Sequence, residues 1–399
     1  MANISCIERA QTLLRYCLDG RAWPKVLLYE LIDECPQEFF RVVVEGLADF
    51  FEPRLCDTYA ALFSDAIEYV LPELRAEALV ARYKRVRRAR TCGGTPKHVF
   101  VLSRVTLGAD IKITSIFLEA AKRRFPEASI HFVGARKAAE LFPSVDQVAV
   151  DYQRGVSLRE RLAPWGEMKA RLSIPDSIVI DPDSRLTQLG LLPVCAEENY
   201  YFFESRAYGG EGTEDLSALV RRWVAETMGI SDEIEQPRAS EPRPSGRGHI
   251  SISLGTGGNA SKRIADPFES ELLRLVAKKP GIVWIDKGAG GEEAVRVDRA
   301  IAGSGIPRDR VLTWEGSFAG FAGLIADSRL YIGYDSAGQH AAAALGVPLL
   351  TIFAGFPSLR MFQRWQPAGA GRIEVVRVDN PDPKIVLAQV EKSLDSLLP

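Results

Sequence analysis

The stretch that decides the fold is residues 331–357, which read YIGYDSAGQHAAAALGVPLLTIFAGFP. An apolar strand at 330–332 leads into Gly333, then a group of small polar residues, and then an alanine-rich helix. In open α/β sheets, the N–H groups at the start of such a helix commonly bind phosphate beyond the carboxyl end of the strand. A second strand at 348–353 ends in a Gly-Phe-Pro turn. The stretch therefore predicts one βαβ unit built around an anion site.

The length and charge of the chain limit the classes of protein it can belong to. Its 399 residues suggest two to three domains, at about 150 residues each. With 50 basic and 52 acidic residues it is nearly neutral, so we expect no nucleic-acid partner. The six cysteines contain no C-x-x-C pair, which disfavours a zinc or disulfide framework and predicts reduced, mostly buried thiols in a cytoplasmic protein.

The sequence predicts neither a secretory signal nor a membrane-spanning helix. The first residues, MANISCIERAQ, lack a basic segment followed by an apolar run, so no secretory signal is expected. The longest apolar run, 341–356, is shorter than a bilayer span and contains Gly346 and Pro348. We interpret it as a buried helix and strand, and we expect a cytoplasmic protein, with a peripheral position at the inner membrane left open.

Residues 1–91 have the periodicity of helices and predict a small helical N-terminal domain. It ends in the basic run Arg82–Arg90, which is followed by the helix-breaking sequence CGGTP. Such a run is typical of a solvated helix face. The alternative is a patch for an anionic membrane surface or a polyanionic acceptor.

From His98 onward, strands alternate with helices, a pattern typical of parallel sheets covered on both faces. Residues 232–248 are rich in Pro, Ser, Gly and charge and predict a linker. The expected organisation is an α/β protein with two Rossmann-like domains, 97–231 and 249–380, and a C-terminal helix at 383–397. Their carboxyl edges would face each other across a cleft. The predicted strands are 98–102, 129–133, 147–150, 177–180, 249–253, 281–285, 310–312, 330–332, 349–353 and 374–378.

The residues themselves resemble a known family. Residues 331–357, with Arg364, Trp365 and Pro367 after them, resemble the C-terminal signature of glycosyltransferase family 9, the ADP-heptose:lipopolysaccharide heptosyltransferases. Three further segments resemble motifs of that family in the same order, covering with the signature about residues 97–380. They are LGADIKIT at 107–114, DSIVIDPDSR at 176–185 and GTGGNASKR at 255–263. The resemblance implies the two-domain GT-B fold, with 97–231 as the acceptor domain and 249–380 as the nucleotide-sugar domain.

The chain also departs from the family pattern. Ala109 separates Gly108 from Asp110, where the family usually has Gly and Asp adjacent, and Ala337 replaces a common glycine. The usual His-Pro-Gly is absent from the first turn after the linker. These differences bear on the sugar donor and the acceptor more than on the fold.

Glycosyl transfer needs a base for the acceptor hydroxyl and positive charge or N–H donors for the leaving diphosphate. Asp110 follows a strand, near the start of a helix expected at Ile111, and the resemblance makes it the catalytic base. The alternative is an ordinary N-terminal helix cap. Lys262, with Arg263 beside it, lies on a glycine-rich turn suited to phosphate, although a surface lysine is the simpler interpretation. The predicted donor-binding residues are Lys262, Thr256, Asp335, Ser336, Ala337, Gly338, His340 and Glu292.

Several of these residues have an alternative role. His340 would contact the donor or simply belong to the capped helix, and the register of Glu292 relative to Glu293 is open. The predicted acceptor-binding residues are Arg185 and Lys112; a structural salt bridge is the alternative for Arg185. Asp181-Pro182-Asp183 resembles an Asp-x-Asp metal site, but turn chemistry at a strand end is the favoured interpretation. We therefore expect no metal and no cofactor.

The sequence thus predicts an inverting, metal-independent glycosyltransferase. The resemblance implies ADP-heptose as the donor and a glycolipid acceptor, a lipopolysaccharide core sugar; the added helical domain makes a protein side chain a second acceptor class. One alternative is transfer of a different nucleotide-activated hexose. Another is a catalytically silent GT-B module that binds a nucleotide sugar or a partner. A homo-oligomer is left open.

Overall fold

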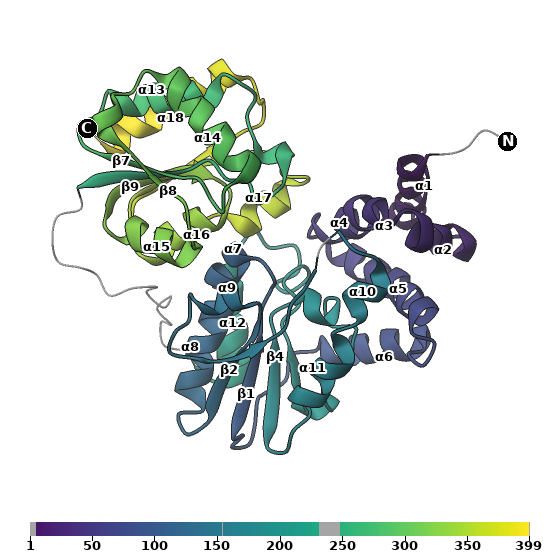
Figure 1. The fold of residues 1–399 in the computed structure, drawn as a ribbon. Coiled ribbons are helices and arrows are strands. Elements are labelled where there is room, and N and C mark those ends of the chain that lie inside the picture. The colour runs from purple at the N-terminus through teal and green to yellow at the C-terminus, as the bar shows by residue number, and fades with distance from the viewer. Residues whose placement is uncertain (1–4, 154, 231–247, 399) are drawn as a thin grey trace.

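A computed structural model describes residues 5–153, 155–230 and 248–398. Two parallel sheets carry helices on their faces, and a group of helices from the N-terminus packs beside the first sheet (Figure 1). The predicted α/β class and the helical N-terminal region are confirmed. The expected linker lies, apart from Gly248, outside the described residues.

The N-terminal region consists only of helices in its described part. Ser5 and Glu8 form a capping box at its first helix, and Pro53 opens its longest helix at a position where a missing N–H costs nothing. The elements are α1 (Cys6–Leu18), α2 (Lys25–Glu34), α3 (Pro36–Glu38), η1 (Phe39–Val44), α4 (Glu45–Ala48), α5 (Pro53–Val70) and α6 (Ala76–Val86).

The apolar core of these helices is continuous with one face of the first sheet. Leu13 and Phe63 from the helices belong to the same buried cluster as Phe100, Val179 and Phe202 from the sheet. The helices therefore supply the layer that covers this face, which in a parallel sheet must be covered. Residues 5–91 and the first sheet thus share a core.

The basic run at the end of α6 contacts residues that follow β4 and β5 (residues 190–204). Arg82 donates to the carbonyl of Gly190 at 2.8 Å, and Arg85 forms two hydrogen bonds to Glu197 at 2.9 and 2.7 Å. Arg87 donates to Glu204 at 3.0 Å. The expectation of a purely solvated face is therefore wrong, because tertiary partners 108 to 117 residues away engage these arginines.

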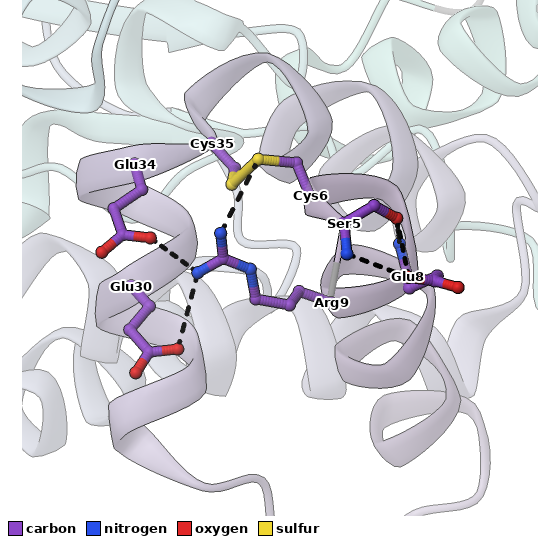
Figure 2. The surroundings of a disulfide bond; sticks show 7 residues. All are labelled: Ser5, Cys6, Glu8, Arg9, Glu30, Glu34 and Cys35. Carbon is purple, nitrogen blue, oxygen red and sulfur yellow. Dashed lines mark hydrogen bonds and ion pairs between the residues drawn. A yellow bond between two sulfur atoms is a disulfide. The ribbon is translucent and has the colours of Figure 1, made fainter. Parts of the chain in front are cut away.

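A disulfide joins Cys6, the first residue of α1, to Cys35, which precedes α3 (Figure 2). The expectation of reduced thiols is wrong for this pair. Their separation of 29 residues matches no short motif, and they meet only because α2 returns along α1. Arg9 lies between this disulfide and Glu34, to which it donates at 2.7 Å. The other cysteines are free: Cys17, Cys56 and Cys92 are buried, and Cys195 is half-buried.

The first sheet has the order β3-β2-β1-β4-β5, with every pair parallel. Its strands are β1 (His98–Leu102), β2 (Ser129–Gly134), β3 (Asp146–Ala149), β4 (Ser177–Asp181) and β5 (Tyr200–Phe202). Its helices are α7 (Leu107–Ala109), η2 (Asp110–Thr114), α8 (Ser115–Arg124), α9 (Arg136–Ala139), α10 (Leu158–Leu162), α11 (Trp165–Leu172), η3 (Arg185–Thr187), η4 (Glu197–Asn199) and α12 (Leu216–Met228).

The second sheet has the order β11-β10-β9-β6-β7-β8, also parallel throughout. Its strands are β6 (His249–Ser253), β7 (Val283–Asp286), β8 (Val311–Trp314), β9 (Ser328–Tyr334), β10 (Leu349–Phe353) and β11 (Ile373–Arg377). Its helices are η5 (Ala260–Lys262), α13 (Phe268–Ala277), α14 (Gly291–Ser304), η6 (Arg308–Arg310), α15 (Phe318–Ala326), α16 (Ala337–Ala344), α17 (Leu359–Trp365) and α18 (Pro383–Leu397).

The strand orders locate the switch points where ligands bind in open sheets. The order reverses between β1 and β4 in the first sheet and between β6 and β9 in the second. The turns after these strands carry Asp110, Arg185, Lys262 and Asp335. The two edges meet, because α7 and η2 contact α16 (Figure 1). These four residues thus lie beside the two switch points.

No helix within 5–153, 155–230 and 248–398 is both long and apolar enough to cross a lipid bilayer.

Candidate donor and acceptor site

Asp110 is fully buried directly after the turn that follows β1. Its Oδ1 accepts the backbone N–H of Arg104 at 2.7 Å and the Thr114 hydroxyl at 2.8 Å, and its Oδ2 accepts the Ser103 hydroxyl at 2.7 Å. Burial raises the pKa of Asp110 to about 6, although these hydrogen bonds oppose the rise. A carboxylate with this pKa can accept a proton near neutral pH.

The alternative role of Asp110 as an N-terminal helix cap is wrong. The helix expected from Ile111 begins earlier, at Leu107, with Thr106 in the cap position. The N–H of Asp110 already donates to the carbonyl of Thr106 at 2.9 Å. Its carboxylate binds the N–H of Arg104, which precedes the helix, so it closes the strand-to-helix turn and caps no helix.

The donor-side turn brings Lys262 and Asp335 together. The Lys262 ammonium donates to Asp335 Oδ2 at 2.5 Å and to its carbonyl at 3.2 Å. Ser336 precedes α16, and within the described chain no side chain caps this helix. Its N–H groups and Lys262 therefore form the positive end of the second switch point. Gly338 is required here, because a Cβ would lie 2.0 Å from the Tyr331 hydroxyl.

His340 and Gly108 connect the two turns. A Cβ on Gly108 would lie 3.2 Å from His340 Cδ2 and 3.3 Å from Ala337 Cα, so the base turn and the donor turn are in van der Waals contact. Burial, with the charges of Lys112 and Lys262, holds the pKa of His340 well below its usual value. The imidazole is therefore neutral at pH 7 and able to accept or donate one hydrogen bond.

The glycine turn after β6 lies close to one of two candidate glutamates. Thr256 is half-buried on this turn, and Glu292 is exposed at the start of α14. The neighbouring Glu293 faces the turn instead, since a Cβ on Gly255 would lie 2.5 Å from its Oε1. Asp286, at the end of β7, accepts the Ser253 hydroxyl at 3.2 Å. Burial raises the pKa of both Glu293 and Asp286.

The two predicted acceptor residues have different surroundings. Lys112 is 1% exposed, and its ammonium donates to Asp215 at 3.1 Å and to the carbonyl of Gln366 at 2.7 Å. It therefore ties the two sheets together and does not point into open space. Arg185 is half-buried in η3, within electrostatic range of Tyr59 and Asp49 of the helical region.

Asp181 and Asp183 make protein contacts only, within the described chain. Asp181 accepts the hydroxyls of Tyr200 and Thr187, each at 2.5 Å, and the N–H of Ser184 at 2.7 Å. Asp183 accepts Arg206 Nε at 3.0 Å. Among the residues that the structure describes, no group of three or more His, Cys, Asp or Glu side chains is arranged to hold a metal ion. The favoured strand-end role matches these contacts.

Two residues near the base were missed from the sequence. The Arg104 guanidinium donates to the hydroxyl of Ser205 at 2.9 Å and lies 5.7 Å above the Trp365 ring. The same Trp365 ring lies 5.9 Å from His340. In the sequence, Trp365 stands out only as part of the C-terminal motif. Nothing in the sequence marks Arg104 as a site residue except its place shortly before Asp110.

Comparison with known proteins agrees with this geometry. Residues 226–386 match the family model of glycosyltransferase family 9 (heptosyltransferase). The structure of the E. coli heptosyltransferase WaaC with ADP-2-deoxy-2-fluoro heptose is 16% identical, with a TM-score of 0.57 over 75% of this chain and 99% of that one. A family 9 glycosyltransferase from Veillonella parvula is 17% identical, with a TM-score of 0.57 over 77% and 99%. No curated protein matches the sequence.

At these identities the structural likeness establishes the fold, and it confirms the predicted GT-B arrangement of two Rossmann-like sheets. The family match covers the glycine turn, Lys262 and the whole of 331–357, which hold most of the residues predicted to bind the donor. Residues 226–386 thus match the model of glycosyltransferase family 9, and the likeness to the solved structures shows the fold of the chain.

Proposed function

We propose that this protein is a glycosyltransferase that transfers heptose from ADP-heptose, with inversion and without a metal, to a lipopolysaccharide core sugar or a protein side chain. The observation that carries the proposal is the contact between the two turns. Asp110, with a pKa of about 6, lies on a helix that packs against α16, whose free N-terminus is next to Lys262. A base and an anion site thus face each other across one boundary.

The chemistry follows from this placement. The acceptor hydroxyl oxygen attacks the anomeric carbon of the donor while its proton passes to the Asp110 carboxylate. The bond from that carbon to the diphosphate oxygen breaks, and the leaving negative charge is stabilised by Lys262 and the N–H groups of α16. Attack opposite the leaving group inverts the configuration of the sugar carbon.

The choice of donor rests on the family and on one neighbour. One structure of similar fold is that of WaaC with ADP-2-deoxy-2-fluoro heptose, and ADP-heptose is proposed here as the donor. Asp335, Ser336, Ala337, Gly338, His340 and Thr256 would surround the nucleotide diphosphate. Glu293, which faces the glycine turn, replaces Glu292 as the acidic residue proposed to contact the nucleoside.

The acceptor and the location are the finer parts of the proposal. Arg185 would meet an anionic acceptor group, and its charge interactions with Tyr59 and Asp49 of the helical region support a site beside that region. Lys84 and Arg88 are exposed and would take part in a peripheral membrane contact. The cytoplasmic expectation loses part of its support, because a disulfide is unusual in that compartment. A homo-oligomer stays a prediction.

A donor panel tests the function. Melting temperatures would be measured with ADP, UDP, GDP, dTDP and their sugars, and radiolabelled transfer would be followed with the donor that binds. ADP-heptose should raise the melting temperature most, because a ligand bound only to the folded state stabilises it. Stabilisation by a UDP sugar would favour transfer of a different hexose. Binding without turnover on any acceptor would favour the silent module.

Lys262→Ala should weaken donor binding by about 1 to 3 kcal/mol, the range for a lost charge-assisted contact. Calorimetric titration with the nucleotide sugar measures this. The matched control is Lys278→Ala, which removes an exposed lysine of the same domain that pairs with Glu391. Equal affinity in wild type and Lys262→Ala would remove Lys262 from the donor site.

Transfer should persist in excess EDTA. The leaving diphosphate would be neutralised by Lys262 and a helix N-terminus, so a divalent cation is not needed for that step. Initial rates with and without chelator measure this. Loss of turnover in EDTA, with recovery on adding Mg²⁺ or Mn²⁺, would return Asp181 and Asp183 to consideration as metal ligands.

A further inference from the structure

Helix α17 is the place where the helical region, the acceptor domain and the donor domain meet. Ser358, at its N-terminus, donates its hydroxyl to the carbonyl of Phe50 at 2.9 Å. Arg360 donates Nε to the carbonyl of Phe51 and its two terminal nitrogens to the carbonyls of Gly210 and Gly212. The distance to Gly212 is 3.1 Å. One guanidinium thus satisfies three carbonyls from two other parts of the chain.

Phe51 is held in an unusual conformation at this junction. Its φ angle is 58°, in the left-handed region that is unfavourable for a bulky side chain, and it is 4% exposed. Its ring meets the Trp365 ring edge-on with centroids 6.3 Å apart. Phe51 belongs to a buried apolar cluster that contains residues of both sheets. The helices next to it belong to a different cluster, which they share with the first sheet alone. The helical region therefore extends one side chain into the boundary between the sheets.

Trp365 connects this contact to both halves of the site. It lies at the end of α17, against Arg104 on the base side and His340 on the donor side. The backbone N–H of Arg104 in turn holds Asp110. A continuous row of contacts thus runs from Phe51 through Trp365 to the candidate base.

We propose that Phe51 and Arg360 are positioning residues of the transferase site. Through them, residues 5–91 hold the donor sheet closed against the acceptor sheet. The expected change in the donor KM rests on the proposed function, whereas the expected change in amide protection does not. The row of contacts gives the helical region a task within the reaction, separate from any part it takes in acceptor recognition.

The physical argument concerns the population of the closed state. Moving the donor sheet away would break all three bonds of Arg360 at once, and its side chain is only 12% exposed in the closed arrangement. Unpaired carbonyls in a partly buried junction are costly, so the bonds favour closure. When a donor requires the closed state, a smaller closed fraction raises its apparent dissociation constant by the same factor and leaves saturated turnover little changed.

The test compares full-length Arg360→Ala, Arg360→Lys and Phe51→Gly with Arg372→Ala. Arg372 is an exposed arginine of the same domain that donates to Ser396, so it controls for loss of a guanidinium. Arg360→Ala should raise the donor KM about tenfold with kcat within about threefold of wild type. Lysine reaches fewer carbonyls, so Arg360→Lys should give an intermediate KM. Phe51→Gly keeps the carbonyl and relieves the backbone, and should still raise the donor KM.

Hydrogen exchange supplies a readout that does not depend on activity. Arg360→Ala and Phe51→Gly should lose amide protection at 209–212 and 358–366, whereas Arg372→Ala should not. Wild-type KM and wild-type protection in both variants would overturn the proposal. If no nucleotide sugar is transferred even by wild type, the proposed function fails, and the exchange result alone decides the positioning role. If Arg360→Ala does not fold, Phe51→Gly decides it by the same two measurements.

Discussion

Asp110→Asn should lower turnover about 100-fold or more while leaving donor affinity nearly unchanged. Asparagine has the same size and can still accept the N–H of Arg104, which Asp110 accepts at 2.7 Å, but it cannot take up a proton. The residue is fully buried on the acceptor side of the boundary, so the donor turn keeps Lys262 and α16. Steady-state rates and donor titrations of the full-length enzyme measure the two effects separately.

The control is Asp176→Asn, which neutralises an exposed aspartate of the same domain. Asp176 has a φ angle of 55°, a conformation that asparagine tolerates well, so the control adds no backbone strain. Near wild-type turnover in Asp110→Asn would show that the buried carboxylate serves only to hold the turn after β1.

The pH profile of wild type gives the same assignment independently. Because burial raises the pKa of Asp110 to about 6, its basic form predominates above that pH. The rate at subsaturating donor and acceptor should therefore rise as pH increases through about 6 and then level off. Asp110→Asn should lose this rise. A wild-type rate that is flat from pH 5 to pH 8 would contradict Asp110 as the base.

Much of the fold could be predicted because buried parallel strands are continuous apolar runs bounded by turns. The strands predicted at 98–102, 249–253 and 349–353 coincide with β1, β6 and β10, and the other predicted strands differ by one or two residues at an end. The strand β5 was missed because Tyr200–Phe202 is only three residues long and has no alternation. Its place at the sheet edge depends on pairing with Val179–Asp181, which a local pattern cannot reveal.

The site was predictable as far as it depends on strand-end turns. Asp110, Lys262 and Asp335 follow strands at switch points, so their types and positions carry the signal. Contacts between segments that are distant in the sequence have no such local signal. Lys112 was taken for an acceptor residue, yet it pairs with Asp215, 103 residues away. The helical region likewise looked separate, because Phe51 meets Trp365 only in the folded chain.

Asp183→Asn should lower the free energy of unfolding by about 3 to 5 kcal/mol, the cost of leaving a buried charge without its partner. Asp183 is 1% exposed and accepts Arg206 Nε at 3.0 Å and Nη2 at 3.2 Å. Burial alone would raise the pKa of Asp183, but Arg206 and Arg104 hold it below its usual value. The carboxylate is therefore charged at neutral pH. Urea unfolding followed by fluorescence measures the change.

Two comparisons separate this structural role from metal binding. Asp266→Asn breaks an exposed pair with Arg263, 2.6 Å apart, and should cost less than about 1 kcal/mol. Asp183→Asn combined with Arg206→Met should recover much of the loss, because the unpaired guanidinium is then gone. The φ angle of Asp183 is 68°, which asparagine accepts, so backbone strain does not explain a large effect. Wild-type stability in Asp183→Asn, together with turnover that then depends on added Mn²⁺, would instead make this aspartate a metal ligand.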